Sequence, residues 1–428
     1  MTGEKPSKIF YGWWILAACS LIGLLSSSSR FSFTMFFPYL LADLGWTRAT
    51  LGFGLTLHMW IYGLAAVAFG FLVDRYGPRL LMVIGGAIVA LGLFLTSKMT
   101  TPLQFYIYYG VILAVGVAST LAVPNIATAR KWFIKKGGLA VALIVAGTTL
   151  GVSLMSLIVP DMVHAFGWRG SWLYIGLVIG VAIMALSWFF VRKDPESMGL
   201  YPDGAEPRSE NAAAEKNAQI QAVPGNEDWT VKEAFKTRSY WLLLIGNAFF
   251  IIPVMGFMGH VAAWGMDIAK ISGVPETNAI GFIKISVFLL GISSVLGSLI
   301  GGPLSDKFGK KSLLILGFIL QICLNFYAMT VDKLTTMIVF SVLAGAVGGT
   351  IVPLWAPYLG DIFGRKSLAA LFGIVVFFVG IVGGAGPVLF GWIFDKSGSY
   401  SWAFIFACVC YLISMVLILF IRKEEKPA

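Results

Sequence analysis

Between two long apolar runs the chain reads Gly70-Phe71-Leu72-Val73-Asp74-Arg75-Tyr76-Gly77-Pro78-Arg79. A second copy follows 232 residues later as Gly302-Pro303-Leu304-Ser305-Asp306-Lys307-Phe308-Gly309-Lys310-Lys311. Glycine at these places permits tight turns and close helix approach, and the aspartate can interact with a helix N-terminus or with the basic residues that follow it. A solvated charged turn would explain a single copy, but matching copies indicate a duplicated unit.

Two further landmarks repeat with almost the same spacing. Trp132-Phe133 resembles Ile362-Phe363, and Ser171-Trp172 resembles Ser401-Trp402, both at an offset of 230 residues. The stretch between the halves is rich in Glu, Asp, Lys, Ala and Pro, a composition that cannot bury enough apolar surface to fold alone. We therefore predict an N-terminal six-helix bundle at 1–192, a cytoplasmic linker at 193–238 and a C-terminal six-helix bundle at 239–428.

The composition is that of an integral membrane protein. Hydrophobic residues make up 58% of the chain, charged residues make up 12%, and the mean hydropathy is +0.85. Twelve apolar runs are long enough to cross a bilayer core of roughly 30 Å as helices. The predicted fold class is all-α, with spans at 11–41, 48–73, 80–98, 103–130, 138–163, 170–192, 239–267, 278–304, 312–330, 334–358, 367–394 and 400–421.

The sequence contains none of the common motifs of catalytic sites. We find no nucleotide-binding loop, no cluster of metal ligands and no nucleophile beside a base in a plausible position. We therefore expect a protein that is not an enzyme, with no cofactor and no bound metal.

Positive charge decides the predicted orientation, because Lys and Arg accumulate in cytoplasmic loops. Placing both termini in the cytoplasm puts 23 of the 31 Lys and Arg residues inside and six outside, and the opposite topology would reverse that bias. The net charge of +10 is then a topological signal, so anionic membrane lipid is an expected partner and nucleic acid is not. The sequence predicts a multi-pass protein of the cytoplasmic (cell inner) membrane.

Two cations, Arg30 and Lys284, cannot be assigned to loops or helix ends. No Asp or Glu lies in the middle of an apolar run to neutralise them. A cation is costly in hydrocarbon, so it persists where it meets water, a partner or a ligand. The pattern favours an anionic substrate as the missing partner.

The pattern Gly-x-Leu-x-Asp-Arg-x-Gly-x-Arg from Gly70 to Arg79 resembles the signature of the major facilitator superfamily, and the resemblance covers essentially the whole chain. It implies a secondary carrier with one central site between two pseudo-symmetric bundles, coupled to protons or a counter-anion. We expect a functional monomer. The two motif copies are expected to act as cytoplasmic gates through Gly70, Asp74, Arg75, Gly77 and Arg79, and through Gly302, Asp306, Lys307, Gly309 and Lys310.

Shorter motifs point to one group within that superfamily. The motifs that resemble the oxalate/formate antiporter and monocarboxylate transporter group are Phe10-Tyr11-Gly12-Trp13, Arg30-Phe31-Ser32-Phe33, Trp132-Phe133 with Gly138-Leu139-Ala140, and Pro195 to Gly204. In that group a basic residue often binds the substrate carboxylate eight positions before the second motif's aspartate, where this chain has Ser298. Residues 367–392 also lack the internal lysine of the oxalate/formate exchangers, so dicarboxylate exchange of that kind loses support.

Arg30 is the stronger candidate for binding the substrate. It lies in the middle to outer third of its helix, after the polar run Ser26 to Ser29, which would be costly against lipid and should face protein or water. A guanidinium can hold a carboxylate through two parallel hydrogen bonds. The alternative is a structural clamp on backbone carbonyls at a helix crossing.

Lys284 does not simply replace the missing base. It lies 14 positions before Ser298, close to four turns and about 21 Å away on the same helix face, which puts it at the external mouth if Ser298 faces the cavity. There it would attract or secondarily hold the anion. The alternative is a lysine that snorkels to the outer surface.

His58 and His260 are the candidate proton carriers, because no carboxylate lies inside the helices and histidine titrates near neutral pH. Either could instead be a core histidine satisfied by hydrogen bonds. Coupling could also use a proton that travels with the substrate, or a cationic site emptied only by another anion. Asn125, Asn247 and Ser298 are further candidates for substrate binding.

The sequence thus favours a secondary active transporter of a small organic anion, such as the monocarboxylates lactate and pyruvate, by proton symport or anion exchange. One alternative is an efflux carrier for amphipathic compounds, which a wholly apolar cavity and a structurally locked Arg30 would support. A second alternative is a membrane sensor that binds a ligand without moving it. The absence of a folded output domain in the linker weighs against the sensor.

Overall fold

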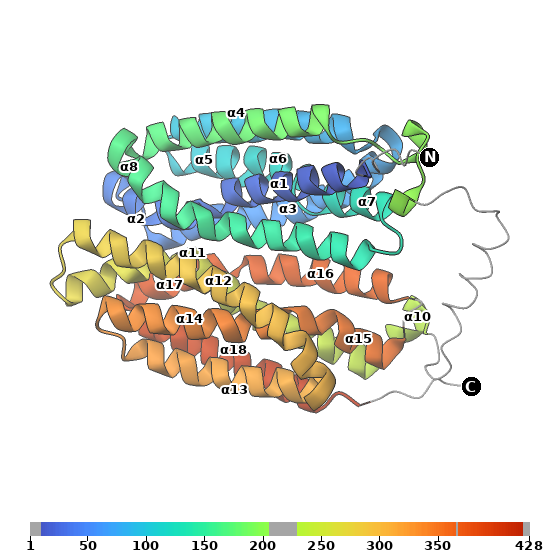
Figure 1. Ribbon diagram of the computed structural model, residues 1–428. Helices are drawn as coiled ribbons and strands as arrows, with labels where there is room; N and C mark the ends of the chain where they lie inside the picture. Colours follow the sequence, from blue (N-terminus) through green and yellow to red (C-terminus); the bar gives the residue numbers. More distant parts are fainter. Residues whose placement is uncertain (1–9, 205–228, 365–366, 423–428) are drawn as a thin grey trace, which may run out of the picture.

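The computed structural model describes residues 10–204, 229–364 and 367–422, and the described residues form helices and no strand. Two groups of helices lie side by side, one from each half of the chain (Figure 1). The first contains α1 (Gly12–Phe31), α2 (Phe33–Leu44), α3 (Arg48–Tyr76), α4 (Pro78–Ser97), α5 (Pro102–Phe105), the π-helical η1 (Tyr106–Leu113), α6 (Ala114–Ala118), α7 (Val123–Trp132) and α8 (Gly137–Phe189), with short turns η2 (Glu196–Met198) and η3 (Pro202–Gly204).

The second group repeats this arrangement. It contains α10 (Val231–Ala234), α11 (Arg238–Ile271), α12 (Glu276–Phe308), α13 (Lys310–Met329), α14 (Leu334–Ile351), η4 (Val352–Leu354), α15 (Trp355–Phe363), α16 (Leu368–Gly384), α17 (Gly386–Ser397) and α18 (Ser401–Leu419). Eleven helical stretches of the described chain are long and apolar enough to cross a membrane. One of them, the 53-residue α8, is broken at Gly167 (φ 66°, ψ 167°), so it makes two crossings. The prediction of twelve spans in two bundles is confirmed.

The duplicated motif forms the same turn in each half. Gly77 joins α3 to α4 with φ 82°, and Gly309 joins α12 to α13 with φ 83°. Backbone at such positive φ is strained for residues with a side chain, and glycine adopts it freely. The predicted role of the motif glycines in tight turns is therefore confirmed at these two positions.

The described chain begins and ends at one end of the bundle, where α1 starts and α18 finishes, as an even number of crossings requires (Figure 1). We name this the terminal end, and the opposite end the distal end. The turns at Gly77 and Gly309 lie at the terminal end, whereas the break at Gly167 lies at the distal end. In the predicted orientation the terminal end faces the cytoplasm.

The two halves are joined at the distal end. Seven of residues 51–60 in α3 are buried, whereas none of residues 61–72, three turns further toward the terminal end, is buried. Hydrogen bonds between the halves run from Thr34 to the Met258 carbonyl at 2.9 Å and, at middle depth, from Trp60 to the Ile381 carbonyl at 2.7 Å. The structure therefore has the halves in contact at the distal side, whereas residues 61–72 of α3 are half-buried or exposed.

Candidate functional site

The serines before Arg30 fix the first helix to its neighbours. Ser26 donates to Thr120 Oγ1 at 2.8 Å, Ser27 to the Thr148 carbonyl at 2.7 Å and Ser28 to the Gly151 carbonyl at 3.1 Å. The helix continues through Ser32, whose backbone is helical (φ −54°, ψ −29°), so α1 and α2 form one 33-residue stretch from Gly12 to Leu44. The expectation that this polar run faces protein is confirmed, and it places Arg30 inside the first half.

Arg30 is a buried cation without a counter-ion in the part of the chain that the structure describes. Its side chain is 9% exposed, and its guanidinium carbon lies 4.6 Å from the centre of the Tyr62 ring and 5.0 Å from that of Phe31. Nε is buried without an acceptor, and no carboxylate or carbonyl in the described chain accepts a hydrogen bond from the guanidinium. The alternative of a clamp on backbone carbonyls therefore finds no support among the described residues.

His58 lies in the same cluster. Its Nδ1 is 2.9 Å from the Tyr109 carbonyl oxygen, which only accepts, so Nδ1 carries the proton and Nε2 has a free lone pair. That Nε2 is fully buried and has no partner. Tyr109 connects both groups, because its hydroxyl donates to the Arg30 carbonyl at 2.6 Å and its ring lies 4.9 Å from the imidazole. Tyr62, one helical turn after His58, brings the same face of α3 over Arg30.

The structure contradicts the expectation that Lys284 lacks a counter-ion. Its Nζ lies 3.0 Å from Asp161 Oδ1 and 3.2 Å from Oδ2, and this ion pair joins α12 to α8 of the other half. The lysine is 27% exposed and the aspartate 70% exposed. Only Arg30 of the two cations therefore remains unneutralised among the described residues.

None of the three further polar candidates forms a hydrogen bond with Arg30 among the described residues. Asn125 is buried and donates to the Thr120 carbonyl at 2.8 Å and to the Leu121 carbonyl, while its Oδ1 has no partner. Ser298 contacts the Ser294 and Gly349 carbonyl oxygens, each at 2.9 Å, so its hydroxyl is engaged between α12 and α14. Asn247 is nearly buried within α11.

The charged motif residues lie at the terminal ends of their helices. Lys310 pairs with Asp361 at 2.6 Å, and the Arg79 guanidinium lies 4.3 Å from the Trp188 ring. The remaining charged residues with described side chains, Arg75, Asp306 and Lys307, are exposed. The side chain of Asp74 lies outside the part of the chain that the structure describes. Gating by these residues stays a prediction.

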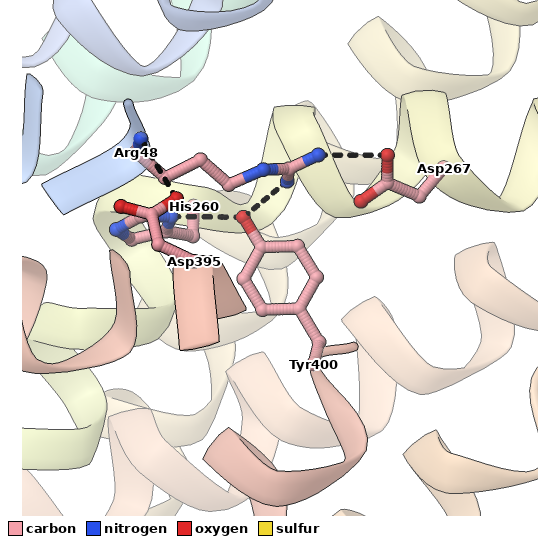
Figure 2. Close-up of polar contacts among 5 residues, drawn as sticks. All are labelled: Arg48, His260, Asp267, Asp395 and Tyr400. Atoms are coloured by element: carbon pink, nitrogen blue, oxygen red, sulfur yellow. Dashed lines mark hydrogen bonds and ion pairs between the residues drawn. The ribbon is translucent and has the colours of Figure 1, made fainter. Parts of the chain in front are cut away.

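A second polar cluster, which the sequence did not predict, joins the halves at the distal end (Figure 2). Arg48 Nη2 donates to Asp267 at 2.8 Å, and Nη1 donates to the Tyr400 hydroxyl at 2.7 Å. Asp395 accepts from the backbone N–H groups of Arg48 at 3.1 Å and Ala49 at 2.8 Å, so it caps α3 from the other half. We call Arg48, Asp267, Asp395 and Tyr400 the Arg48 clamp.

His260 continues this cluster into the interior (Figure 2). Its Nδ1 lies 2.8 Å from the Tyr400 oxygen, and its Nε2 lies 2.8 Å from the Pro387 carbonyl oxygen. The imidazole is 1% exposed. His260 therefore belongs to the clamp region, apart from the cluster of Arg30 and His58.

Two helical halves that cross a membrane twelve times and meet at one end, with a buried cation that no described residue neutralises, are typical of a membrane transporter. The sequence model described as Major Facilitator Superfamily matches residues 19–291 and 278–428. The chain belongs to the major facilitator superfamily.

Similar proteins cover nearly the whole chain. Monocarboxylate transporter 12 of Xenopus laevis is 24% identical over 448 residues, which span 98% of this chain and 91% of that protein. The oxalate:formate antiporter of Oxalobacter formigenes is 24% identical over 404 residues, 91% of this chain and 88% of that protein. A crystal structure of the nucleoside transporter NupG superposes with a TM-score of 0.72 at 13% identity, over 96% of this chain and 98% of that one.

Proposed function

We propose that this protein carries a small organic anion, a monocarboxylate such as lactate or pyruvate, across the cytoplasmic membrane by alternating access. The observation that carries the proposal is Arg30, a buried guanidinium with no acceptor in the described chain. A carboxylate would supply the missing charge and accept two parallel hydrogen bonds. The similarity to monocarboxylate and oxalate:formate transporters supports the same class of substrate.

The position of His58 beside Arg30 provides a way to couple anion transport to proton uptake. A proton on its bare Nε2 would turn that atom from an acceptor into a donor and add a positive charge near Arg30. A bound anion would offset the repulsion, so proton and anion would each increase the affinity for the other. That reciprocity favours proton symport, in which proton and anion cross the membrane together. If His58 takes up no proton, Arg30 alone favours exchange, because the site is then emptied most readily by another anion.

The proposed orientation places the terminal end in the cytoplasm and the distal end outside. The structure would then be an inward-facing state, closed toward the outside and poised to release or accept the anion on the cytoplasmic side. Alternating access requires a second state in which the distal contacts separate and the terminal ends meet.

Uptake into proteoliposomes tests the function directly. We expect saturable uptake of labelled lactate and pyruvate, less uptake of oxalate, and stimulation by an inward proton gradient. Counterflow at equal pH, with each unlabelled anion loaded inside, distinguishes exchange from symport. Uptake of none of five small anions (lactate, pyruvate, formate, acetate and oxalate), beyond that of empty liposomes, would contradict the proposal.

Lys284 should affect the rate at which the anion is captured and not the affinity with which the anion is bound. Replacing it by glutamine would leave the Asp161 charge unpaired at the proposed external mouth, where that charge repels anions. We expect a several-fold lower uptake rate at low ionic strength, with little change at about 0.5 M salt, where screening is strong. Initial uptake rates across a salt series measure this.

The matched control is the double variant Lys284→Gln with Asp161→Asn, which carries neither charge. Its uptake rate should return toward that of the wild type. A single variant whose uptake is lost equally at every salt concentration would instead indicate direct binding or a structural role.

A further inference from the structure

The Arg48 clamp carries an inference about how the distal side opens. Arg48 is 11% exposed and Asp267 22% exposed, so their ion pair is largely shielded from water. The guanidinium also lies 3.6 Å from the centre of the Phe394 ring. Asp267 Oδ2 is buried without a partner, so the carboxylate is held by one hydrogen bond and not two. The clamp therefore joins the halves through the single link to Asp267, the link to Tyr400 and the two backbone hydrogen bonds to Asp395.

Hydrogen-bond chemistry fixes where the protons lie in the series of hydrogen bonds that runs from Arg48 through Tyr400 and His260 to the Pro387 carbonyl. The Pro387 carbonyl only accepts, so His260 Nε2 carries a proton. Arg48 only donates, so the Tyr400 oxygen accepts from it and the Tyr400 proton points to His260 Nδ1. In the closed structure His260 is therefore neutral, with every polar atom of its ring paired.

A second proton on His260 is incompatible with this arrangement. Nδ1–H would also have to donate to the Tyr400 oxygen, and the Tyr400 proton would lose its acceptor. The His260 imidazolium and the Arg48 guanidinium would then both donate to the Tyr400 oxygen. Two positive charges that are separated by only one oxygen atom repel each other. The ionisable groups around His260 are Arg48, Tyr400, Asp267 and Asp395, while α2 and α17 contribute the rings of Phe37 and Phe390.

We propose that the Arg48 clamp is the lock that holds the distal gate closed, and that a proton taken up by His260 releases it. Separation of the halves would expose the imidazole to water, where its charged form is stable, so opening and proton uptake favour each other. The lock binds no substrate, but it rests on alternating access, which is part of the proposed function. Acid conditions on the distal side should therefore shift the population toward the open state.

Labelling of an introduced cysteine tests the lock without any substrate. Ile280 lines a small hollow between the halves at the distal end, together with Met35, Tyr39 and Met266. In purified Ile280→Cys protein we expect maleimide labelling to be slow at about pH 7.5. At about pH 5.5, after correction for the intrinsic rate on free thiol, it should be about tenfold faster, the factor that roughly 1.4 kcal/mol of weakened closure gives.

Three variants distinguish loss of the lock from loss of its release by a proton. Arg48→Gln should label fast at both pH values, and Arg48→Lys, which keeps a cation for Asp267, should label at an intermediate rate. His260→Gln retains a donor for Pro387 and cannot take up a proton, so it should label slowly at both pH values. The parent chain with its native cysteines gives the background rate, and gel filtration checks that each variant is folded.

Two results would overturn the inference. One is labelling of Arg48→Gln as slow as that of the reporter protein, which would mean that the clamp does not hold the gate. The other is an undiminished pH response in His260→Gln, which would place the titrating group elsewhere. Because the labelling needs no anion, a failed transport assay and a failed lock give different results.

Discussion

Arg30→Gln is expected to abolish saturable anion uptake. The variant keeps a polar side chain of similar length but removes the one buried charge that has no counter-ion in the described chain. A carboxylate entering the site would then be desolvated without a cation, a loss of about 3–5 kcal/mol for a buried pair that loses one partner. We expect the transport rate at low substrate to fall by a factor of 100 or more, on the order of that energy. Initial rates and direct binding by calorimetry measure the effect.

Two control variants distinguish the effect of losing the Arg30 charge from other effects of the substitution. Arg30→Lys retains the charge and loses the planar fork, so it should keep measurable uptake with weaker affinity. Arg169→Gln removes an exposed arginine that pairs with Asp43 at 3.0 Å on the surface, and it should transport as the wild type does. Transport of every accepted anion by Arg30→Gln at the wild-type rate would make the central assignment wrong.

The environment of Arg30 could be predicted from the sequence only in outline. The four serines before it made a lipid-facing position costly, and the hydroxyls of Ser26, Ser27 and Ser28 do contact neighbouring segments of the same half. The contact of Arg30 with the Tyr62 ring could not be predicted, because the two residues lie on separate helices and the apolar pattern does not fix how those helices are rotated. The free lone pair of His58 could not be predicted from the sequence either, because it depends on which ring nitrogen faces the Tyr109 carbonyl.

The contacts between the halves could not be predicted at all. Arg48 and Asp267 are 219 residues apart, and Arg48 and Tyr400 are 352 apart. Each looks in the sequence like an ordinary residue at a helix end. The same holds for Lys284 and Asp161, 123 residues apart, whose pairing corrects the expectation of two equivalent free cations. Hydropathy and repeats predict the helices of each half, whereas cross-half pairs depend on the conformation in which the halves meet.

The close contact of α12 with α14 gives the second large effect, on stability. Gly349→Ala would place a methyl group into the backbone of Ser294, overlapping its carbonyl oxygen. Small residues allow membrane helices to approach closely, and backbone cannot move aside as a side chain can. Overpacking costs about 1–3 kcal/mol, and forcing the helices apart would also loosen the neighbouring contact of Gly297 with Ala346. We expect a clearly lower melting temperature of the purified protein.

The adjacent glycine supplies a control of opposite sign. Alanine at Gly348 would meet only the Gln321 amide, at 3.6 Å, which is ordinary van der Waals contact. Within a helix, alanine is favoured over glycine by about 1 kcal/mol, so Gly348→Ala should leave the melting temperature unchanged or raise it. Two neighbouring positions with the same substitution thus share composition, helix and depth and differ only in what the methyl group meets. Equal melting temperatures for the two variants would show that the α12 and α14 backbones are not in close contact at Gly349, and the packing argument would then be wrong.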